Sequence, residues 1–227
     1  MSKLVFDAAG RRYFETGVDH GVLFRKNEAG TAYEAGVPWN GLVSVTESPE
    51  GAEASDIYAD NMKYLTLRSP ENLKLTVEAF TYPDEFEVCD GSAELSPGFK
   101  ISQQTRRQFA LAYRTLIGSD ANPELGYKLH IVYGCTAAPT ERANSTVNDS
   151  PETMTMSWEV STIPVEVANH KPTAHISIDS TKISAAALAK IEEALYGKDG
   201  TPGSESGLLT PDQLLALIAG LNDSSDI

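Results

Sequence analysis

Histidines and clustered carboxylates are the residues of this chain whose types could do chemistry. Four histidines, His20, His130, His170 and His175, could hold a metal ion or move a proton only if folding gathered them. Their spacing pairs none of them with a cysteine or with a second close histidine, so we interpret them as incidental surface or strand positions. Asp19 and His20 could imitate half of a catalytic triad, but no nucleophile is identifiable for it. The sequence therefore predicts no catalytic residue here.

An acidic stretch offers a second possible site. The chain carries a formal net charge of −14, and the segment 47–94 holds twelve Asp or Glu against three Lys or Arg. Within it, Asp84-Glu85-Phe86-Glu87 followed by Asp90-Gly91 suggests a calcium loop. An EF-hand needs acids or Asn at alternate positions directly before its glycine, and this spacing fails. We predict a solvated acidic turn at 83–94 and no bound metal.

Composition and missing motifs exclude several function classes. The motifs G-x-S-x-G, G-x-x-x-x-G-K, H-E-x-x-H and G-x-G-x-x-G are absent, so we expect neither an enzyme nor a cofactor. The acidic balance argues against a protein that binds nucleic acid through its phosphates. Cys89 and Cys135 are best interpreted as two buried thiols. With neither the apolar core of a signal peptide nor a membrane-spanning run, the chain is expected to be made in a cytoplasm.

The elements that would position these residues are mostly strands. Alternating apolar and polar residues predict strands at 18–25, 41–47, 62–68, 73–82 and 153–162, among others. Two further strands, around 109–114 and 127–133, are expected to have one wetter face, carrying Ala110 and Ala112 in the first and His130 and Val132 in the second. The segment 48–61 is expected to be a long loop, and Glu78 to point away from the core. Because helices are absent until residue 184, the pattern favours an antiparallel sandwich or barrel.

Two helices are predicted near the end of the chain. Ser184 can cap the first helix, and Gly197 can end it. The second begins with a capping box from Thr210 to Gln213, with proline at the first helical position. This apolar helix must dock on its own domain, on a neighbouring subunit or on another protein. The residues expected to dock are Leu209, Leu214, Leu217 and Ile218.

Several short segments, in order along residues 15–197, resemble the major tail proteins of long-tailed (siphovirus-type) bacteriophages. They are G-V-D-H-G-V-L at 17–23, V-P-W-N-G-L at 37–42, Y-A-D-N-M-K-Y-L at 58–65, E-A-F-T-Y-P-D-E-F at 78–86, C-D-G-S-A-E-L at 89–95 and V-N-D-S-P-E at 147–152.

This resemblance implies a fold and a function. The implied fold is mainly β, a two-sheet sandwich or barrel with one flanking helix. The residue pattern adds a short C-terminal helix on a linker, which lies outside the resemblance. The implied function is structural: hexameric rings of this protein stack into the tail tube of the virion, and the genome passes through it. The implied partners are further copies, the tape measure, tail terminator and distal tail proteins, and double-stranded DNA that passes without specific binding. No membrane partner is implied. The expected divisions are a tail-tube domain 1–197 with an N-terminal arm 1–16, a stacking loop 48–61 and a helix 184–196, then a flexible linker 198–207 and a C-terminal helical arm 208–227.

Charge and resemblance together suggest roles for particular residues. Carboxylates on the wall of a tube would repel DNA and limit sticking. The lumen candidates are Glu47, Glu53, Asp60 and Glu78. In the family, a loop at the place of 48–61 reaches the adjoining ring, which makes Glu50, Asp56, Tyr58 and Asn61 the ring-stacking candidates.

Two other classes remain open from the sequence. A virion decoration or host-attachment module could use the same acidic sandwich, with an exposed aromatic patch and discrete small oligomers. An enzyme would need a pocket that gathers His20 or His130 with carboxylates, and we expect none. A tube of a related contractile injection system is not distinguished from a phage tail by these residues.

Overall fold

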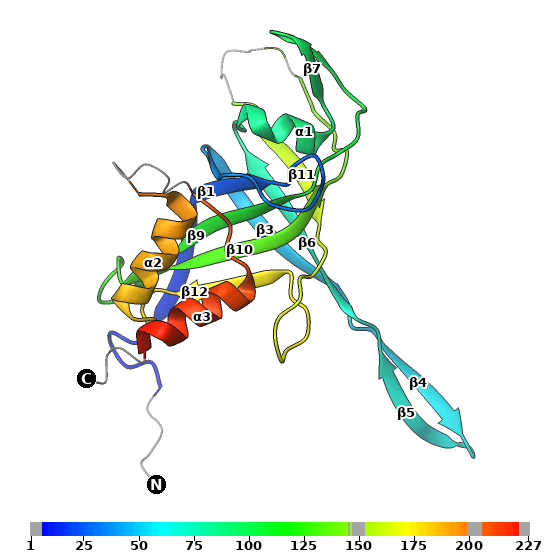
Figure 1. The fold of residues 1–227 in the computed structure, drawn as a ribbon. Coiled ribbons are helices and arrows are strands. Elements are labelled where there is room, and N and C mark those ends of the chain that lie inside the picture. Colours follow the sequence, from blue (N-terminus) through cyan, green and yellow to red (C-terminus); the bar gives the residue numbers. More distant parts are fainter. Residues whose placement is uncertain (1–5, 145, 147–152, 199–205, 223–227) are drawn as a thin grey trace.

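The computed structural model describes residues 6–144, 146, 153–198 and 206–222. It is mainly β, with helices against one side of the sheets and a long two-stranded arm that projects from the body (Figure 1). This confirms the mainly β fold with flanking helices. None of the described helices has the length and apolar character needed to cross a membrane.

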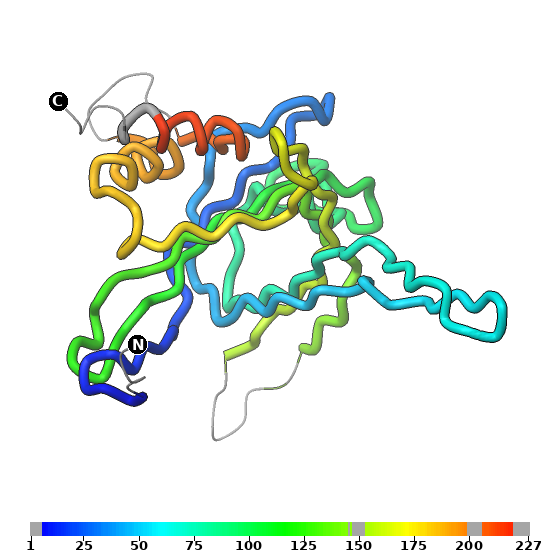
Figure 2. Tube along the Cα trace, turned by 90° about the horizontal axis from the view of Figure 1, so that it is seen from below, coloured from blue at the N-terminus to red at the C-terminus, as the bar shows by residue number. Residues whose placement is uncertain are grey.

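The main sheet follows the order β2-β1-β9-β10-β11-β6-β3, and β12 also pairs with β10. All of these neighbours are antiparallel. The strands of this sheet are β1 (Tyr13–Arg25), β2 (Val37–Trp39), β3 (Leu42–Gly51), β6 (Glu71–Ala79), β9 (Phe109–Ser119), β10 (Gly126–Ala137), β11 (Met156–Ser161) and β12 (His175–Asp179). The sheet bends so that β11, β6 and β3 form a second layer facing β1 and β9 (Figure 2).

The bend falls at a bulge in β10. Val132 pairs with Leu111 and Cys135 with Phe109, so three steps along β10 match two along β9. Gly134 adopts φ +61°, and a Cβ there would lie 2.3 Å from the carbonyl oxygen of Ile163. Only glycine fits this backbone without strain. Beyond the bulge β10 pairs with β11 instead of β12, which joins the two layers.

Between the layers lies an aromatic core. The ring of Phe86 lies 4.5 Å from that of Trp39 and 5.2 Å from that of Trp158, and all three side chains are buried. Burying each such side chain stabilises the fold by about 1.5–3 kcal/mol. Phe86 comes from the predicted acidic turn, which instead forms a 3-10 helix η1 (Asp84–Phe86) and a short helix α1 (Glu87–Asp90). A small hairpin follows, made of β7 (Ala93–Ser96) and β8 (Phe99–Ile101).

The opposite face of β1, β9 and β10 is covered by helices α2 (Ala185–Tyr196) and α3 (Pro211–Asn222) (Figure 1). The Ser184 side chain accepts a hydrogen bond from the Ala187 amide and caps α2, as predicted. Gly197 ends that helix with φ +80°. The expected flexible linker falls largely on 199–205, which lie outside the described residues.

The central strands differ from the prediction of one wetter face. Ala110 and Ala112 are fully buried under the helices, and Val132 is fully buried between the layers. His130 is only 8% exposed. The prediction was wrong because it assumed a single covered face, whereas β9 and β10 lie in the middle of three layers.

Candidate functional site: a projecting hairpin arm

The arm is a two-stranded hairpin of β4 (Ala54–Ala59) and β5 (Met62–Arg68). Asp60 and Asn61 form its turn with φ +51° and +61°. Two consecutive positive φ values match a type I′ turn, whose twist suits a two-residue hairpin connection. The predicted loop 48–61 is therefore wrong. Its residues belong to the end of β3, to β4 and to the turn, and only Ala52 and Glu53 lie between β3 and β4.

The arm continues the ribbon that β3 and β6 begin in the body. The two parts meet at Gly51, where φ is +89° and a Cβ would lie 2.4 Å from the carbonyl oxygen of Pro70. Ala52 beside it also has a positive φ, of +54°. Proline lacks an amide donor, so regular pairing stops at this point and resumes at Ala54 opposite Arg68. A joint therefore separates the arm from the body.

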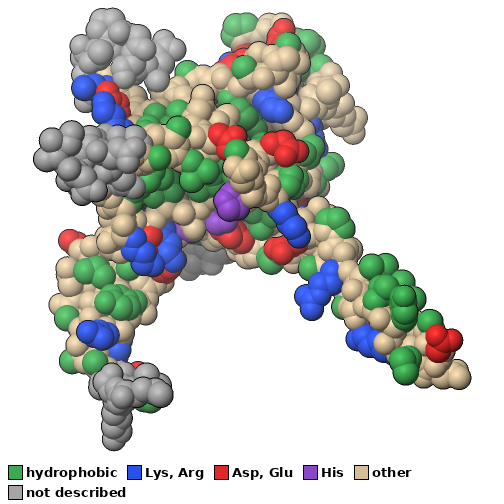
Figure 3. Space-filling view, turned by 60° about the horizontal axis from the view of Figure 1, so that its bottom comes forward, with side chains coloured by type: hydrophobic (Ala, Val, Ile, Leu, Met, Phe, Trp, Pro, Cys, Tyr) green, Lys and Arg blue, Asp and Glu red, His purple; other side chains and the backbone are tan. Residues whose placement is uncertain are grey.

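Large apolar side chains are exposed on both faces of the arm, and Figure 3 shows those on the visible side. Leu65 and Leu67 share one face with Ile57, because Ile57 is the cross-strand partner of Leu65. Tyr58 follows Ile57 directly in β4, so it lies on the other face, and it is 68% exposed. Tyr64 is 69% exposed at a bulge in β5. Within the described chain, β4 and β5 pair only with each other, so both outer edges are open. An isolated hairpin is marginally stable in water, and open edges invite pairing.

Polar contacts brace the arm locally. The Lys63 ammonium lies 2.7 Å from the Asp56 carboxylate, which also accepts a hydrogen bond from the Thr66 hydroxyl. These contacts lower the pKa of Asp56 below its usual value, the bond from Lys63 contributing most. At the base, Lys74 pairs with Glu50 at 2.8 Å. Both pairs are exposed to solvent, where water and salt screen the attraction, so they brace the arm only weakly.

The four ring-stacking candidates all lie on the arm or at its base. Glu50 is at the base and Asp56 is held by Lys63, while Tyr58 is exposed near the tip and Asn61 is in the turn. From the sequence we expected these residues in a loop, whereas the structure places them in β3, in β4 and in the hairpin turn.

The four lumen candidates do not share one surface. Glu53 and Asp60 lie on the arm. Glu47 pairs with Leu75 and points to the interior side of the β3–β6 ribbon, whereas Glu78 pairs with Ser44 and points to the outer side, as predicted. The Glu78 carboxylate accepts a hydrogen bond of 2.9 Å from the Ser44 hydroxyl. A single wall can therefore include Glu47 or Glu78 but not both.

The C-terminal helix docks on its own chain. Leu214 is buried in the core under the helices, with Leu209, Leu217 and Ile218 packed against the same cluster. The Tyr133 hydroxyl donates to the Leu209 carbonyl at 2.8 Å. These are the four residues that we expected to dock from the sequence.

The predicted capping box of α3 is present. The Gln213 side chain accepts a hydrogen bond from the Thr210 amide at 2.9 Å, and the Thr210 hydroxyl accepts one from the Gln213 amide at 3.3 Å. These reciprocal bonds satisfy two amides that the helix itself leaves without partners.

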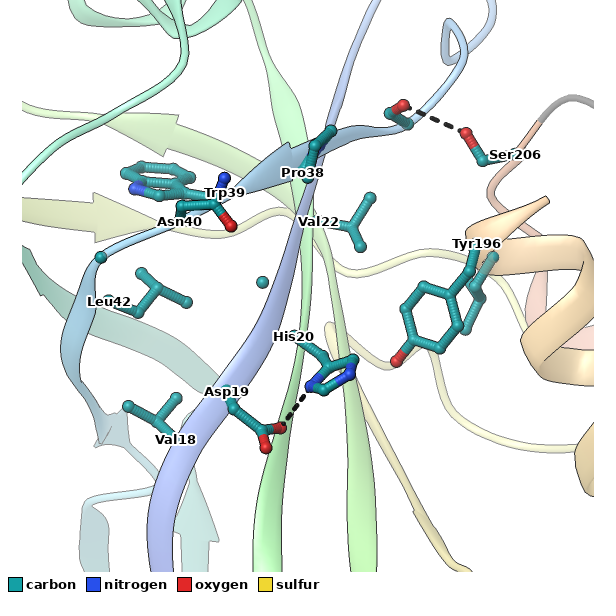
Figure 4. A pocket seen from close by; sticks show the side chains of 14 residues that line it. Val18, Asp19, His20, Val22, Pro38, Trp39, Asn40, Leu42, Tyr196 and Ser206 are labelled. Carbon is teal, nitrogen blue, oxygen red and sulfur yellow. Dashed lines mark hydrogen bonds and ion pairs between the residues drawn. The ribbon is translucent and has the colours of Figure 1, made fainter. Parts of the chain in front are cut away.

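A cavity of about 560 Å³ lies between β1, the β2–β3 connection and the end of α2 (Figure 4). His20 Nδ1 lies 3.0 Å from Asp19 at its edge. We expected no pocket to combine these groups, and that expectation was wrong. Arg114 nevertheless binds the Asp19 carboxylate through two hydrogen bonds of 2.9 and 3.1 Å and lowers its pKa. The Ser206 hydroxyl donates to the Gly36 carbonyl. The described lining thus presents no nucleophile bonded to a base.

The acidic segment before β7 is held by ion pairs. Glu87 pairs with Lys100, and Asp90 pairs with Arg142. Cys89 beside them is free and buried, and so is Cys135 in the core, which confirms the interpretation as two buried thiols. Phe86 from the same segment is buried in the core. The segment 83–94 is therefore not the solvated turn that we predicted from the sequence.

One cluster was missed by sequence reasoning. Glu47 of β3, His130 of β10 and His175 of β12 meet at one end of the space between the layers. His130 Nδ1 lies 3.0 Å from His175 Nε2, and the two rings are parallel within 4°. The β10–β12 register pairs Val132 with His175, which makes the histidines diagonal neighbours on one face. No spacing in the sequence indicates this register.

Comparisons with known proteins give only distant similarities. No family model matches the chain, and no curated protein matches it. One similar solved structure is a chain of the anti-feeding prophage baseplate, with 8% identity and a TM-score of 0.40 over 79% of this chain and 100% of that one. Another is a chain of the extended sheath–tube complex of an extracellular contractile injection system, with 10% identity and a TM-score of 0.31 over 70% and 88%. A chain of the sheath/tube terminator of such a system has 11% identity and a TM-score of 0.28 over 78% and 99%. Likenesses at this level do not assign a function.

Proposed function

We propose that this protein is a structural subunit of a virion, the tail-tube protein of a long-tailed phage. Copies form rings of six, the rings stack, and the genome passes through the lumen. One observation carries the proposal: a hairpin arm projects from a well-packed body and exposes apolar side chains on both faces. The resemblance in the residues 17–23, 37–42, 58–65 and 78–86 supports the same conclusion.

The arm needs cover that its own chain does not supply among the described residues. Tyr58 and Leu67 are 68% and 55% exposed and lie on opposite faces. Burying apolar surface yields about 25 cal/mol per Å², so a second copy that receives the arm gains from both faces. The open edges of β4 and β5 also offer backbone groups to another strand. We therefore assign the arm to the contact with the adjoining ring.

The lumen wall is assigned to the outer face of β11, β6 and β3. Glu78 and Glu159 both point to this side, beside serine and threonine side chains. Carboxylates without nearby bases repel DNA phosphates, whereas hydroxyl groups add no charge. Lys74 lies on the same face, but Glu50 neutralises it at 2.8 Å. The genome would therefore slide along an acidic and polar wall.

The partners and the location of the protein follow from the family that the sequence resembles. The ends of such a tube would contact the tail terminator and distal tail proteins, and the lumen would first hold the tape measure. The protein would be made in the host cytoplasm and would then function in the tail of the virion.

Removal of the arm tests the proposal. The segment 55–67 is replaced by Asn-Gly, which can close a two-residue turn between the paired residues Ala54 and Arg68. We expect this variant to keep the circular dichroism spectrum and unfolding midpoint of the full chain, because the arm adds little to the core. We expect it to form no stacked rings in negative-stain images.

A matched control and the opposing outcomes make the experiment decisive. Glu124→Gln, in the β9–β10 connection, changes one exposed charge away from the arm and should assemble like the full chain. Tubes formed equally well without the arm would contradict the proposal. So would a full chain that stays monomeric at high concentration with a tail initiator, or forms only discrete small oligomers as a decoration protein would. A tube whose outer wall carries Glu78 would overturn the lumen assignment.

A further inference from the structure

The cluster of Glu47, His130 and His175 has the spacing of a metal site. The Glu47 carboxylate oxygen lies 3.7 Å from His130 Nδ1 and 3.6 Å from His175 Nε2, and the two nitrogens are 3.0 Å apart. Tetrahedral coordination with bonds of about 2.0–2.1 Å puts ligand atoms about 3.3 Å from each other. The three observed separations lie on both sides of that value. Shifts of a few tenths of an ångström would therefore complete one face of a tetrahedron.

Neighbouring side chains orient two of the ligands. Thr115 Oγ1 lies 3.0 Å from His130 Nε2, the ring nitrogen that points away from the cluster. When Nε2 donates to this hydroxyl, Nδ1 keeps its lone pair for the cluster. The Tyr113 hydroxyl donates to the Glu47 oxygen at 2.6 Å, and its ring stacks on that of His130 at 4.7 Å. Outer partners of this kind commonly fix the ligands of protein metal sites.

The surroundings favour neutral imidazoles and leave a route from solvent. Burial lowers the pKa of both histidines, more than the attraction of Glu47 raises it. Neutral imidazole is the form that binds metals. Glu47 is one-third exposed at its side chain, so water can reach the fourth coordination position.

We propose that Glu47, His130 and His175 bind a divalent transition-metal ion of the zinc type, with water as the fourth ligand. Two imidazole nitrogens and one carboxylate oxygen form a ligand set that zinc accepts. In the metal-free protein His175 Nε2 can donate to His130 Nδ1, and when the ion binds, His175 carries its proton on Nδ1 instead, so that Nε2 is free for the ion. The assignment does not depend on tube formation.

The position of the site gives the ion a structural role. His130 and His175 lie on adjacent paired strands, whereas Glu47 comes from β3 in the other layer. Glu50, at the base of the arm, follows Glu47 by three residues in β3. A bound ion therefore fixes β3 to the central sheet close to the joint at Gly51. Metal binding would stiffen the support of the arm.

Calorimetric titration of the EDTA-treated full chain with Zn²⁺ tests this proposal. We expect one ion per chain, micromolar or tighter binding, and a higher thermal unfolding midpoint at saturating zinc. Glu47→Gln and His175→Gln should each weaken binding by at least about tenfold, because each removes a ligand or its charge. Co²⁺ bound at the same site should show the visible absorption of tetrahedral coordination.

Two controls separate this site from incidental binding. His20→Gln and His170→Gln change histidines outside the cluster and should leave the affinity unchanged. Circular dichroism of each variant shows whether it is folded, and Glu47→Gln keeps the size of the side chain. Absence of zinc binding at 100-fold excess over the chain would overturn the proposal. Equal affinity in the cluster and control variants would overturn it as well, because the ion would then lie elsewhere.

Discussion

The β9–β10 and β4–β5 hairpins have similar alternating sequences but opposite surroundings. In β9, Leu111 and Ala112 point to different faces, and each is buried in its own core. In β4, Ile57 and Tyr58 also point to different faces, and both are exposed. The apolar content of a strand therefore does not reveal whether its own chain covers it. An assembling protein can leave a ribbon of core-like composition for another copy to bury.

The largest expected difference between the two hairpins is in solvent access. The native thiols provide an internal reference, since burial raises the pKa of Cys89 to about 12 and also raises that of Cys135. In unassembled Tyr64→Cys protein, we expect the introduced thiol to react with a disulfide reagent at least about 100-fold faster than the native pair, which must wait for opening of the fold. Reaction rates followed by absorbance measure this ratio.

Assembly should remove that difference in reactivity. The thiol introduced at position 64 is expected to become protected when rings stack, while the native thiols stay protected throughout. Equal reactivity of all three thiols in the unassembled protein would contradict the exposed arm.

Truncation of leucine should give the next largest difference. Leu111→Ala leaves a cavity between the layers, and we expect it to lower the free energy of unfolding by about 2–5 kcal/mol. Leu67→Ala removes a side chain that is 55% exposed, and we expect less than about 0.5 kcal/mol in the unassembled protein. Urea unfolding of both variants measures the contrast. A similar loss in both would mean that the arm is packed against the body in solution.

The smallest difference concerns backbone strain. Gly134→Ala places a Cβ against the Ile163 carbonyl at φ +61°, so we expect a global loss of about 1–3 kcal/mol. Asn61→Ala also strains a positive φ, by about 1–2 kcal/mol, but at the tip of the arm. In the Asn61→Ala variant, amide hydrogens of β4 and β5 should exchange faster than in the unchanged protein, and those of the body should not. A lower global unfolding midpoint for Asn61→Ala would show that the arm and body unfold together.

Local patterns predicted much of the fold because their causes are local. The alternation along β6 and β11 placed Val77 and Trp158 in the core, and both are buried. The caps at Ser184 and Thr210 were found because a side chain bonds to an amide three residues away. The arm was missed because the turn Asp60-Asn61 lacks the glycine that commonly marks a type I′ turn.

The sequence by itself determined the mainly β class, the two late helices and the acidic charge. Each of these depends on spacing, capping or composition within a short window. Only the tertiary structure decided that Glu47 and Glu78 point to opposite sides, that α3 covers its own sheet, and that Glu47 meets His130 and His175. Strand register and layer order bring together residues that lie 45 or more positions apart, and no local pattern specifies those pairings.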